Sequence, residues 1–156
     1  MSESNFPGLD RLIAMLERTT KREVVVGYPT ATGAELHPGS SITNAQLAAR
    51  LSFGDPEKGL EARPFIQQGI ENGQKRIQDV LANGLRRAAR GEGAVDAAYE
   101  AAGVAAVGAV QAEVRKGNFA PNKPGTIARK GSSRPLIDEG NLIQSTTSEV
   151  RDARSK

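Results

Sequence analysis

The sequence predicts an α+β fold in which a small antiparallel sheet packs with a long antiparallel helical hairpin and shorter helices. Three observations carry this prediction. Small and apolar residues recur at helical spacing over two long segments that are separated by the short break Gly91-Glu92-Gly93. Three consecutive valines from Val24 are typical of a buried strand. A β-prone segment at 145–150, close to the end of the chain, provides that strand with a partner.

Length and composition limit the kinds of site that the chain can hold. Its 156 residues fit one domain, which we expect to span 1–150 with long loops at 29–42 and 117–135 and a frayed tail at 151–156. Aromatic residues are only 4% and tryptophan is absent, so a large aromatic-lined ligand pocket is not expected. The absence of cysteine excludes disulfides, thiolate zinc sites and cysteine nucleophiles. The net charge of +3 is too mild to indicate a nucleic-acid binder by itself.

The first predicted element is an amphipathic helix that begins at Pro7 and ends near Thr20. Two β-branched residues in succession weaken a helix at that end. The predicted strand follows at 23–28. The apolar face of the helix consists of residues at helical spacing: Leu9, Leu12, Ile13 and Leu16.

The next part of the chain contains a loop and a short helix. Residues 29–42 show no periodicity, and a loop of that length is usually functional or disordered. Either Ser41 or Thr43 is suited to cap a helix at 44–51, with Leu47, Ala48 and Leu51 facing inward. Gly54-Asp55-Pro56 ends it.

Two long helices are predicted next. Pro64 suits the first turn of the first helix, and the second runs from 94 to 116. The short break between them predicts an antiparallel hairpin. Both helices contain interior glycines, each of which costs about 0.8–1 kcal/mol relative to alanine. Close approach of two helix backbones explains this cost, and packing within the chain is favoured over packing between subunits. The glycines concerned are Gly69, Gly73, Gly84, Gly103 and Gly108.

From Gly117 onward the chain is rich in proline and glycine. We expect a helical turn at 126–130, another at 138–143 with Asp138 as its N-cap, and the last strand at 145–150. This strand is expected to pair with the one at 23–28.

No constellation of residues predicts catalysis, and no cofactor or metal is expected. His37 lies in the loop at 29–42, which offers none of the rigid support that a nucleophile and its base require. Asp138 and Glu139 are adjacent, and neighbouring helical residues do not face each other. No phosphate-binding glycine motif is present.

One segment stands out electrostatically, because six basic residues and no acidic one lie between Glu113 and Asp138. One interpretation is a solvated basic loop. The other is a patch that faces DNA phosphates or an acidic partner, which would make the chain a small basic DNA-binding protein. A second cluster, Arg86, Arg87 and Arg90, ends the first long helix. The six residues are Arg115, Lys116, Lys123, Arg129, Lys130 and Arg134.

Two blocks of sequence resemble a known family. The first contains Asn44-Ala45-Gln46-Leu47-Ala48, then Phe53-Gly54, then Ala62-Arg63-Pro64-Phe65. The second runs from Thr126-Ile127-Ala128-Arg129-Lys130-Gly131-Ser132-Ser133 through Arg134-Pro135-Leu136-Ile137-Asp138 to Leu142-Ile143. In this order the blocks resemble the neck and tail-completion proteins of tailed bacteriophages, which join the DNA-filled head to the tail.

The resemblance implies a structural protein of the virion neck with no catalytic centre, assembled in the host cytoplasm. Its implied partners are other copies of itself in a ring, the head–tail connector, and the tail terminator or tail tube. Contact with packaged DNA is a further expectation, and no membrane partner is expected. The candidate interface residues are Arg63, Phe65, Arg115, Lys116, Lys123, Arg129, Lys130, Arg134, Leu136 and Ile137.

Overall fold

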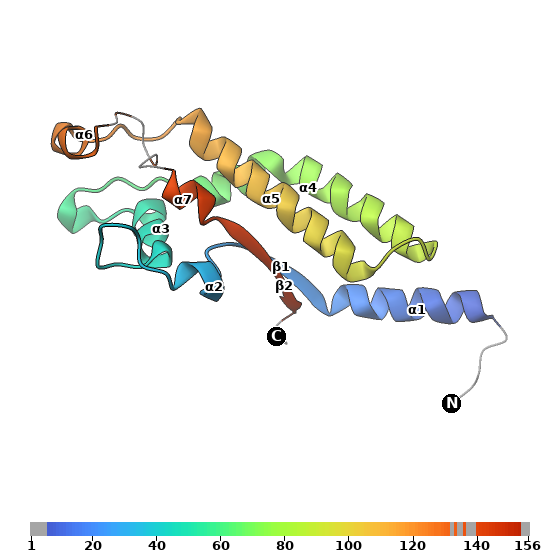
Figure 1. Cartoon of the computed structure of the whole chain (residues 1–156). Coiled ribbons are helices and arrows are strands. Elements are labelled where there is room, and N and C mark those ends of the chain that lie inside the picture. Colours follow the sequence, from blue (N-terminus) through green and yellow to red (C-terminus); the bar gives the residue numbers. More distant parts are fainter. Residues whose placement is uncertain (1–5, 132, 134–135, 137–139, 154–156) are drawn as a thin grey trace.

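The computed structural model describes residues 6–131, 133, 136 and 140–153, and it confirms the α+β fold. A two-stranded antiparallel sheet packs on the long helical hairpin, and most of the shorter helices gather at one end of the molecule, while the first helix lies at the other (Figure 1). The elements in chain order are α1 (Pro7–Thr20), β1 (Arg22–Gly27), α2 (Thr30–Gly33), α3 (Asn44–Phe53), the 3₁₀ turn η1 (Pro56–Lys58), α4 (Phe65–Ala89), α5 (Val95–Lys116), α6 (Pro124–Lys130), α7 (Asn141–Gln144) and β2 (Thr147–Asp152).

Glycines let α4 and α5 approach each other closely, as predicted. A Cβ atom added at Gly69 would lie 2.6 Å from Val110 Cα, which is backbone and cannot move aside. At Gly73 and Gly84 the added atom would meet an alanine side chain of α5. These three glycines therefore serve packing within the chain.

The two glycines of α5 have different surroundings. Gly103 lies against Ser148 of β2, so it brings the helix close to the sheet. Gly108 is exposed, and a Cβ atom there would meet nothing within 4 Å. Packing within the chain does not explain Gly108.

The sheet joins the two ends of the chain, as expected. Val24 of β1 lies opposite Val150 of β2 in an antiparallel register. The prediction of a frayed tail from residue 151 is wrong for its first two residues, because Arg151 and Asp152 belong to β2. Cross-strand ion pairs extend the strand beyond its apolar part: Arg151 Nε lies 2.7 Å from Glu23 Oε1, and Arg22 Nη1 lies 2.6 Å from Asp152 Oδ1.

The two predicted loops contain short regular elements. The loop at 29–42 includes α2, and an isolated bridge pairs Leu36 with Thr43. The loop at 117–135 includes α6, which covers the helical turn expected at 126–130. Near the chain end, α7 begins at Asn141 with Gly140 as its N-cap, within the stretch 138–143 where a helical turn with Asp138 as N-cap was expected. Asp138 itself lies outside the described residues.

Helix α3 begins as its sequence predicts. Thr43 Oγ1 accepts a hydrogen bond from Gln46 N at 3.2 Å, and Gln46 Oε1 accepts one from Thr43 N at 3.0 Å. This capping box satisfies two donors that would otherwise lack partners at the start of the helix.

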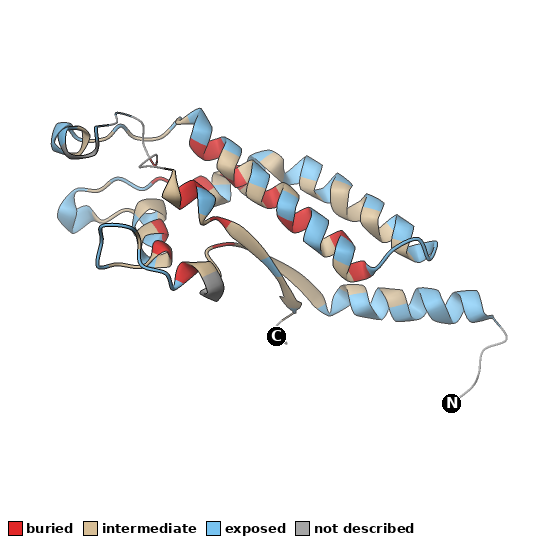
Figure 2. Ribbon diagram, in the orientation of Figure 1, coloured by how far each residue is buried: buried red, intermediate tan, exposed pale blue. Residues whose placement is uncertain are grey.

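The main core lies where α3, the start of α4, the end of α5 and α7 meet. Phe65 and Val110 have no exposed surface, and buried residues shown in red follow the inner side of α5 into this region (Figure 2). The core is aliphatic apart from Phe65, as the composition predicts. Its buried members are Ala48, Phe65, Val110, Val114, Leu136, Leu142 and Ile143.

Helix α1 forms as predicted, but it contributes no buried residue (Figure 2). Its last turn attaches to α5, where Tyr99 Oη donates to Thr19 O at 2.8 Å. The four residues of its apolar face remain between 40% and 52% exposed: Leu9, Leu12, Ile13 and Leu16.

Asp96 at the start of α5 holds α1 and β1 in place. Its carboxylate lies 2.6 Å from Arg18 Nη2 and 2.9 Å from Arg22 Nε. The hydrogen bonds from Arg18 and then Arg22 hold the pKa of Asp96 below its usual range. Because the folded-state pKa is lowered, this carboxylate stabilises the fold above its unfolded pKa, and that contribution is lost as the pH falls through the folded pKa.

We therefore expect Asp96→Asn to be less stable than the wild type at neutral pH, and the difference to shrink as the pH falls below about 4. Urea denaturation at neutral and acidic pH measures the effect. Asp79→Asn is the control, because Asp79 is exposed and lies 3.9 Å from Lys75 Nζ in a surface pair. An equal stability difference at both pH values would contradict the role of Asp96.

Candidate docking cleft

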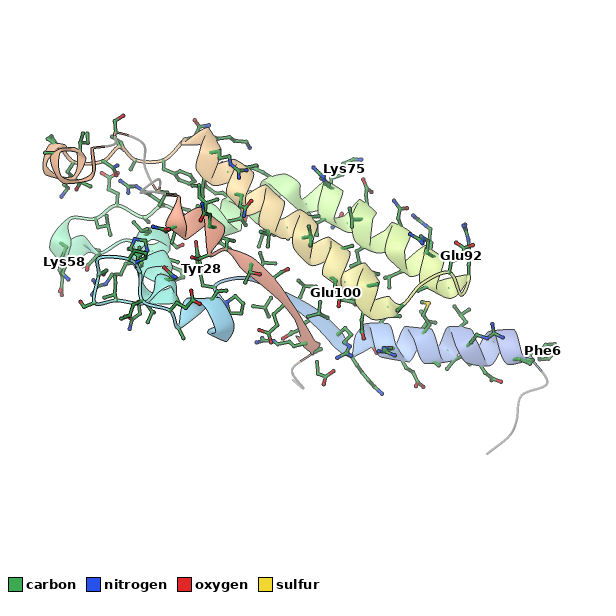
Figure 3. The ribbon with its side chains drawn as sticks, viewed as in Figure 1. Phe6, Tyr28, Lys58, Lys75, Glu92 and Glu100 are labelled. Atoms are coloured by element: carbon green, nitrogen blue, oxygen red, sulfur yellow. The ribbon has the colours of Figure 1, made fainter. Side chains whose placement is uncertain are left out.

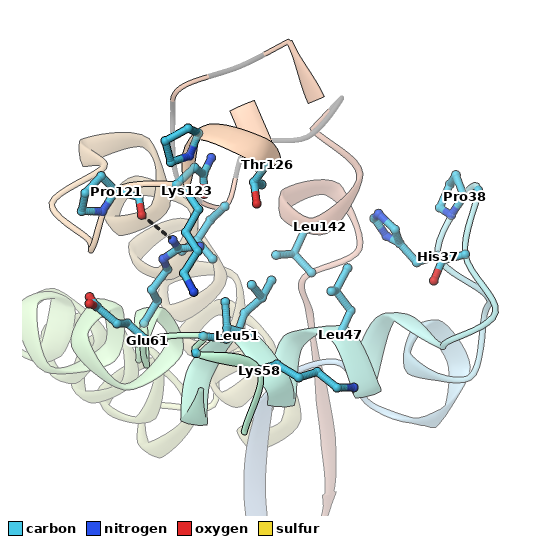
Figure 4. Close-up of a pocket in the computed structure, with 18 residues that line it drawn as sticks. His37, Pro38, Leu47, Leu51, Lys58, Glu61, Pro121, Lys123, Thr126 and Leu142 are labelled. Carbon is cyan, nitrogen blue, oxygen red and sulfur yellow. Dashed lines mark hydrogen bonds between the residues drawn. The ribbon is translucent and has the colours of Figure 1, made fainter. Parts of the chain in front are cut away.

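A cleft of about 1100 Å³ lies between α3, the segment after it, and the parts of the chain that precede α6 and α7 (Figure 4). Leu47 and Leu51 line it from α3, and Leu142 lines it from α7. Pro121 and Thr126 complete the opposite side. The two blocks that carry the family resemblance are far apart in sequence, and both contribute to this cleft.

Leu136 forms part of the apolar lining and is only 6% exposed. Its φ of 63° is in the left-handed region, which costs a residue with a side chain roughly 1–2 kcal/mol. Burial of the leucine side chain offsets a cost of that size. The backbone at Leu136 is therefore held in a strained conformation that seats its side chain in the core.

Arg63 fastens the segment after α5 to the start of α4. Its Nε donates to Ala120 O at 3.0 Å and its Nη2 donates to Pro121 O at 3.1 Å. Arg63 is 6% exposed, and burial lowers the pKa of its guanidinium, which nevertheless stays charged. Arg63 therefore joins the start of α4 to two backbone carbonyls of the segment that follows α5.

Replacing Arg63 by methionine is expected to lower the free energy of unfolding by about 1.5–3 kcal/mol, since hydrogen bonds to a charged group are lost. Amide hydrogen exchange in residues 117–123 should become faster. Chemical denaturation and exchange mass spectrometry measure both effects. Arg50→Met is the matched control, because Arg50 is exposed. If the two variants are equally stable, the two carbonyl contacts do not fasten this segment.

Charged side chains lie around the mouth of the cleft. Lys58, Glu61 and Lys123 are exposed and line it (Figure 4). The side chain of Lys123 reaches Gly59: a Cβ atom added at that glycine would lie 2.7 Å from Lys123 Nζ. A lining of leucine side chains mixed with polar groups, with both signs of charge at its mouth, suits a protein segment better than it suits a small anion.

Three of the predicted interface residues are buried within the chain. Phe65 has no exposed surface, so it is a core residue and leaves nothing for a partner to contact. Leu136 is likewise buried within its own chain, and Arg63 uses its donors on internal carbonyls. These three side chains hold segments of the chain together, and Arg63 and Leu136 also line the cleft.

Arg115 and Lys116 are exposed at the end of α5, as an interface requires. Lys116 Nζ lies 2.9 Å from the buried carboxylate of Glu113, which also accepts a hydrogen bond from Asn72 Nδ2 at 2.9 Å. These two hydrogen bonds lower the pKa of Glu113. Lys116 therefore has a structural role, while Arg115 and Lys123 are exposed basic residues on the same end of the molecule.

The remaining predicted residues are only partly described. Arg129 and Lys130 belong to α6, and nothing is described of their side chains. Arg134 and Ile137 lie outside the described residues. The second basic cluster, Arg86 to Arg90, ends α4 at the hairpin turn, whereas Arg115 ends α5 at the opposite end (Figure 1). The described residues of the two clusters therefore do not form one continuous surface for a DNA duplex.

His37 is half-buried, and its Nδ1 lies 3.1 Å from Asn44 Oδ1. Asn44 is buried, and its amide nitrogen lies 3.5 Å from Thr32 O. The nearby Ser40 Oγ accepts a hydrogen bond from Ile42 N. These contacts connect the loop to the start of α3.

Sequence reasoning missed a buried polar cluster behind the cleft. Tyr28 Oη donates to Leu142 O at 2.7 Å and accepts a hydrogen bond from Thr146 Oγ1 at 3.0 Å. Burial raises the pKa of Tyr28 to about 12. The cluster joins the end of β1 to α7, and no local sequence signal reveals a pairing between residues so far apart.

Among the described residues, no group of three or more His, Asp or Glu side chains is arranged to hold a metal ion. None of the described helices is long and apolar enough to cross a membrane. No known protein family, curated protein or solved structure matches the chain.

Proposed function

We propose that this chain is a structural protein of the tailed-phage neck, a tail-completion component that helps to join the head connector to the tail. It acts by assembly, as a ring-forming or adaptor subunit. The observation that carries the proposal is the cleft, because it unites the two sequence blocks that resemble this family. Arg63 from the first block fastens the segment that leads into the second.

The features of the cleft support docking of a protein partner. Leu47, Leu51 and Leu142 give it an apolar lining. Exposed Lys123 provides positive charge at its mouth, and exposed Arg115 lies eight residues earlier, in the last turn of α5. Charges at the rim of an interface mainly set the rate and specificity of docking, whereas the apolar interior contributes affinity.

Reversing the rim charges tests the proposal in the phage that encodes the chain. Lys123→Glu combined with Arg115→Glu is expected to leave separate DNA-filled heads and finished tails, visible by electron microscopy, because the docking surface then repels an acidic partner. Both side chains are exposed, so the fold should remain intact.

The matched control is Arg86→Glu combined with Arg90→Glu, which makes the same change of charge on exposed residues at the opposite end of the hairpin. It should give joined, infectious particles. Joined particles from both double variants would contradict the proposal. If the purified chain instead binds duplex DNA in a salt-dependent way that the first pair abolishes, the DNA-binding alternative would be favoured.

A further inference from the structure

The ring of His37 is held in a fixed orientation at the edge of the cleft, which it helps to line (Figure 4). Its Nδ1 lies 3.1 Å from Oδ1 of Asn44, a residue that is only 2% exposed. The nitrogen of the same amide group, Nδ2, lies 3.5 Å from Thr32 O. A carbonyl oxygen can only accept hydrogen bonds, so the amide nitrogen of Asn44 faces Thr32 and its oxygen faces His37.

This arrangement decides which nitrogen of the neutral imidazole carries the proton. Asn44 Oδ1 is an acceptor, so His37 Nδ1 must donate to it. The second ring nitrogen, Nε2, then carries a lone pair and is itself an acceptor. Among the residues that the structure describes, none forms a hydrogen bond with Nε2. The cleft therefore presents a hydrogen-bond acceptor in a fixed position at this edge.

Lys123 adds a positive charge for which the described residues supply no ion-pair partner. The other two exposed charges at the mouth are offset within the chain. Lys58 Nζ lies 3.8 Å from Asp55 Oδ2. Burial lowers the pKa of Arg63 and the nearby carboxylate of Glu61 opposes that effect, so the charges of these two residues offset each other. A group that docks beside Lys123 is therefore favoured if it is negatively charged.

Apolar side chains separate the two polar positions. Figure 4 shows Lys123 and His37 on opposite sides of the cleft, and three leucines lie between them. A small anion would leave the leucines uncovered, and a purely apolar segment would leave the acceptor and the ammonium group without partners. A peptide segment can meet all three needs, because it carries backbone N–H groups as well as apolar and acidic side chains. The leucines are Leu47, Leu51 and Leu142.

We propose that His37 determines specificity in the cleft, and that the cleft takes a peptide segment of a partner protein. That segment places an aliphatic side chain on the leucines, a carboxylate beside Lys123 and an N–H or O–H donor at His37 Nε2. The inference rests on the proposed function, because it states the chemistry that the docking partner presents. It also gives the single histidine of the chain a role in recognition.

Nuclear magnetic resonance of the full chain tests the orientation of the ring. The chain contains one histidine, so labelling with isotope-enriched histidine gives signals from His37 alone. At mildly alkaline pH, long-range proton–nitrogen spectra should show the proton on Nδ1. A proton on Nε2 would overturn the proposal, because no acceptor would then face the cleft.

A displayed library of random peptides, selected against the immobilised full chain, supplies a probe for docking. We expect the enriched peptides to contain an acidic residue together with a leucine, isoleucine, valine or methionine. Selection against Lys123→Gln should lose the preference for acidic residues. The matched control is Lys75→Gln, an exposed lysine on α4 that does not line the cleft, and it should keep that preference. No enrichment over a bare support, or enriched peptides without an acidic residue, would contradict the proposed occupant.

Two substitutions of His37 separate recognition from support of the loop. Asparagine places its amide nitrogen where Nδ1 lies, so it keeps only the hydrogen bond to Asn44. Glutamine reaches the position of Nε2, so it keeps only the acceptor for the partner. Isothermal titration with a synthetic copy of the most enriched peptide compares them. His37→Asn should weaken binding roughly 3- to 10-fold, as expected for the loss of one hydrogen bond, whereas His37→Gln should bind nearly as tightly as the wild type.

The reverse order of affinities would mean that the ring only supports the loop, and it would overturn the proposal. Equal affinities of the wild type and both variants would do the same. If either result accompanies failure of head–tail joining in the Lys123/Arg115 variant, the proposed function stands without this inference. If the peptide results are as expected and that variant still gives joined particles, the proposed function alone is rejected and the cleft binds such a segment for another purpose.

Discussion

Replacing Phe65 by alanine is expected to lower the free energy of unfolding by about 3–5 kcal/mol. The side chain has no exposed surface and lies in the core where α3, α5 and α7 meet. Its loss removes apolar burial and leaves a cavity that the surrounding helices only partly fill. Domains of ordinary stability have about 5–15 kcal/mol in total, so the variant should be largely unfolded under mild denaturing conditions.

Urea denaturation followed by circular dichroism measures this effect. Phe53→Ala is the matched control, because Phe53 is 83% exposed and its truncation should change the stability of the isolated chain by no more than about 0.5 kcal/mol. Equal losses in the two variants would place Phe65 outside the core.

Alanine at Gly69 and alanine at Gly108 are expected to change stability in opposite directions. At Gly69 the new Cβ would lie 2.6 Å from Val110 Cα, so α4 and α5 must separate, and overpacking of this kind costs about 1–3 kcal/mol. At Gly108 nothing lies within 4 Å, so the variant should gain about 0.8–1 kcal/mol from the higher helix propensity of alanine.

Thermal and chemical denaturation at low protein concentration compare the two variants without contributions from self-association. Each variant serves as the control for the other, since the same glycine-to-alanine change is made in the two helices of one hairpin. Destabilisation at Gly108 equal to that at Gly69 would mean that a close neighbour also faces Gly108.

Periodicity and turn residues predicted most of the elements, because both act locally. The break at Gly91-Glu92-Gly93 predicted the hairpin, and Thr43 predicted the start of α3. The pairing of the first and last strands was also predicted, since only two β-prone segments were available. The predicted ends of the elements were less accurate. Ion pairs such as Arg151–Glu23 extend β2 beyond the point where the alternation of apolar residues stops.

What covers each apolar face could not be read from the sequence. Leu9 and Leu136 both look like apolar anchors, yet Leu136 is buried in its own chain while Leu9 is half exposed. A pattern identifies an apolar face but not its neighbour, which depends on contacts between distant segments. The partners of Arg63 illustrate the same limit, since Ala120 O lies 57 positions further along the chain.

The sheet that joins the two chain ends has a consequence for the order of folding. Arg22 and Asp152, which meet across β1 and β2, are 130 positions apart. Closing so long a loop costs entropy before any contact is gained, and pairings of this kind slow folding. The α4–α5 hairpin, built from nearby residues, is expected to assemble first and to bring the two strands together. During synthesis β1 would then remain unpaired until β2, at residues 147–152, has left the ribosome.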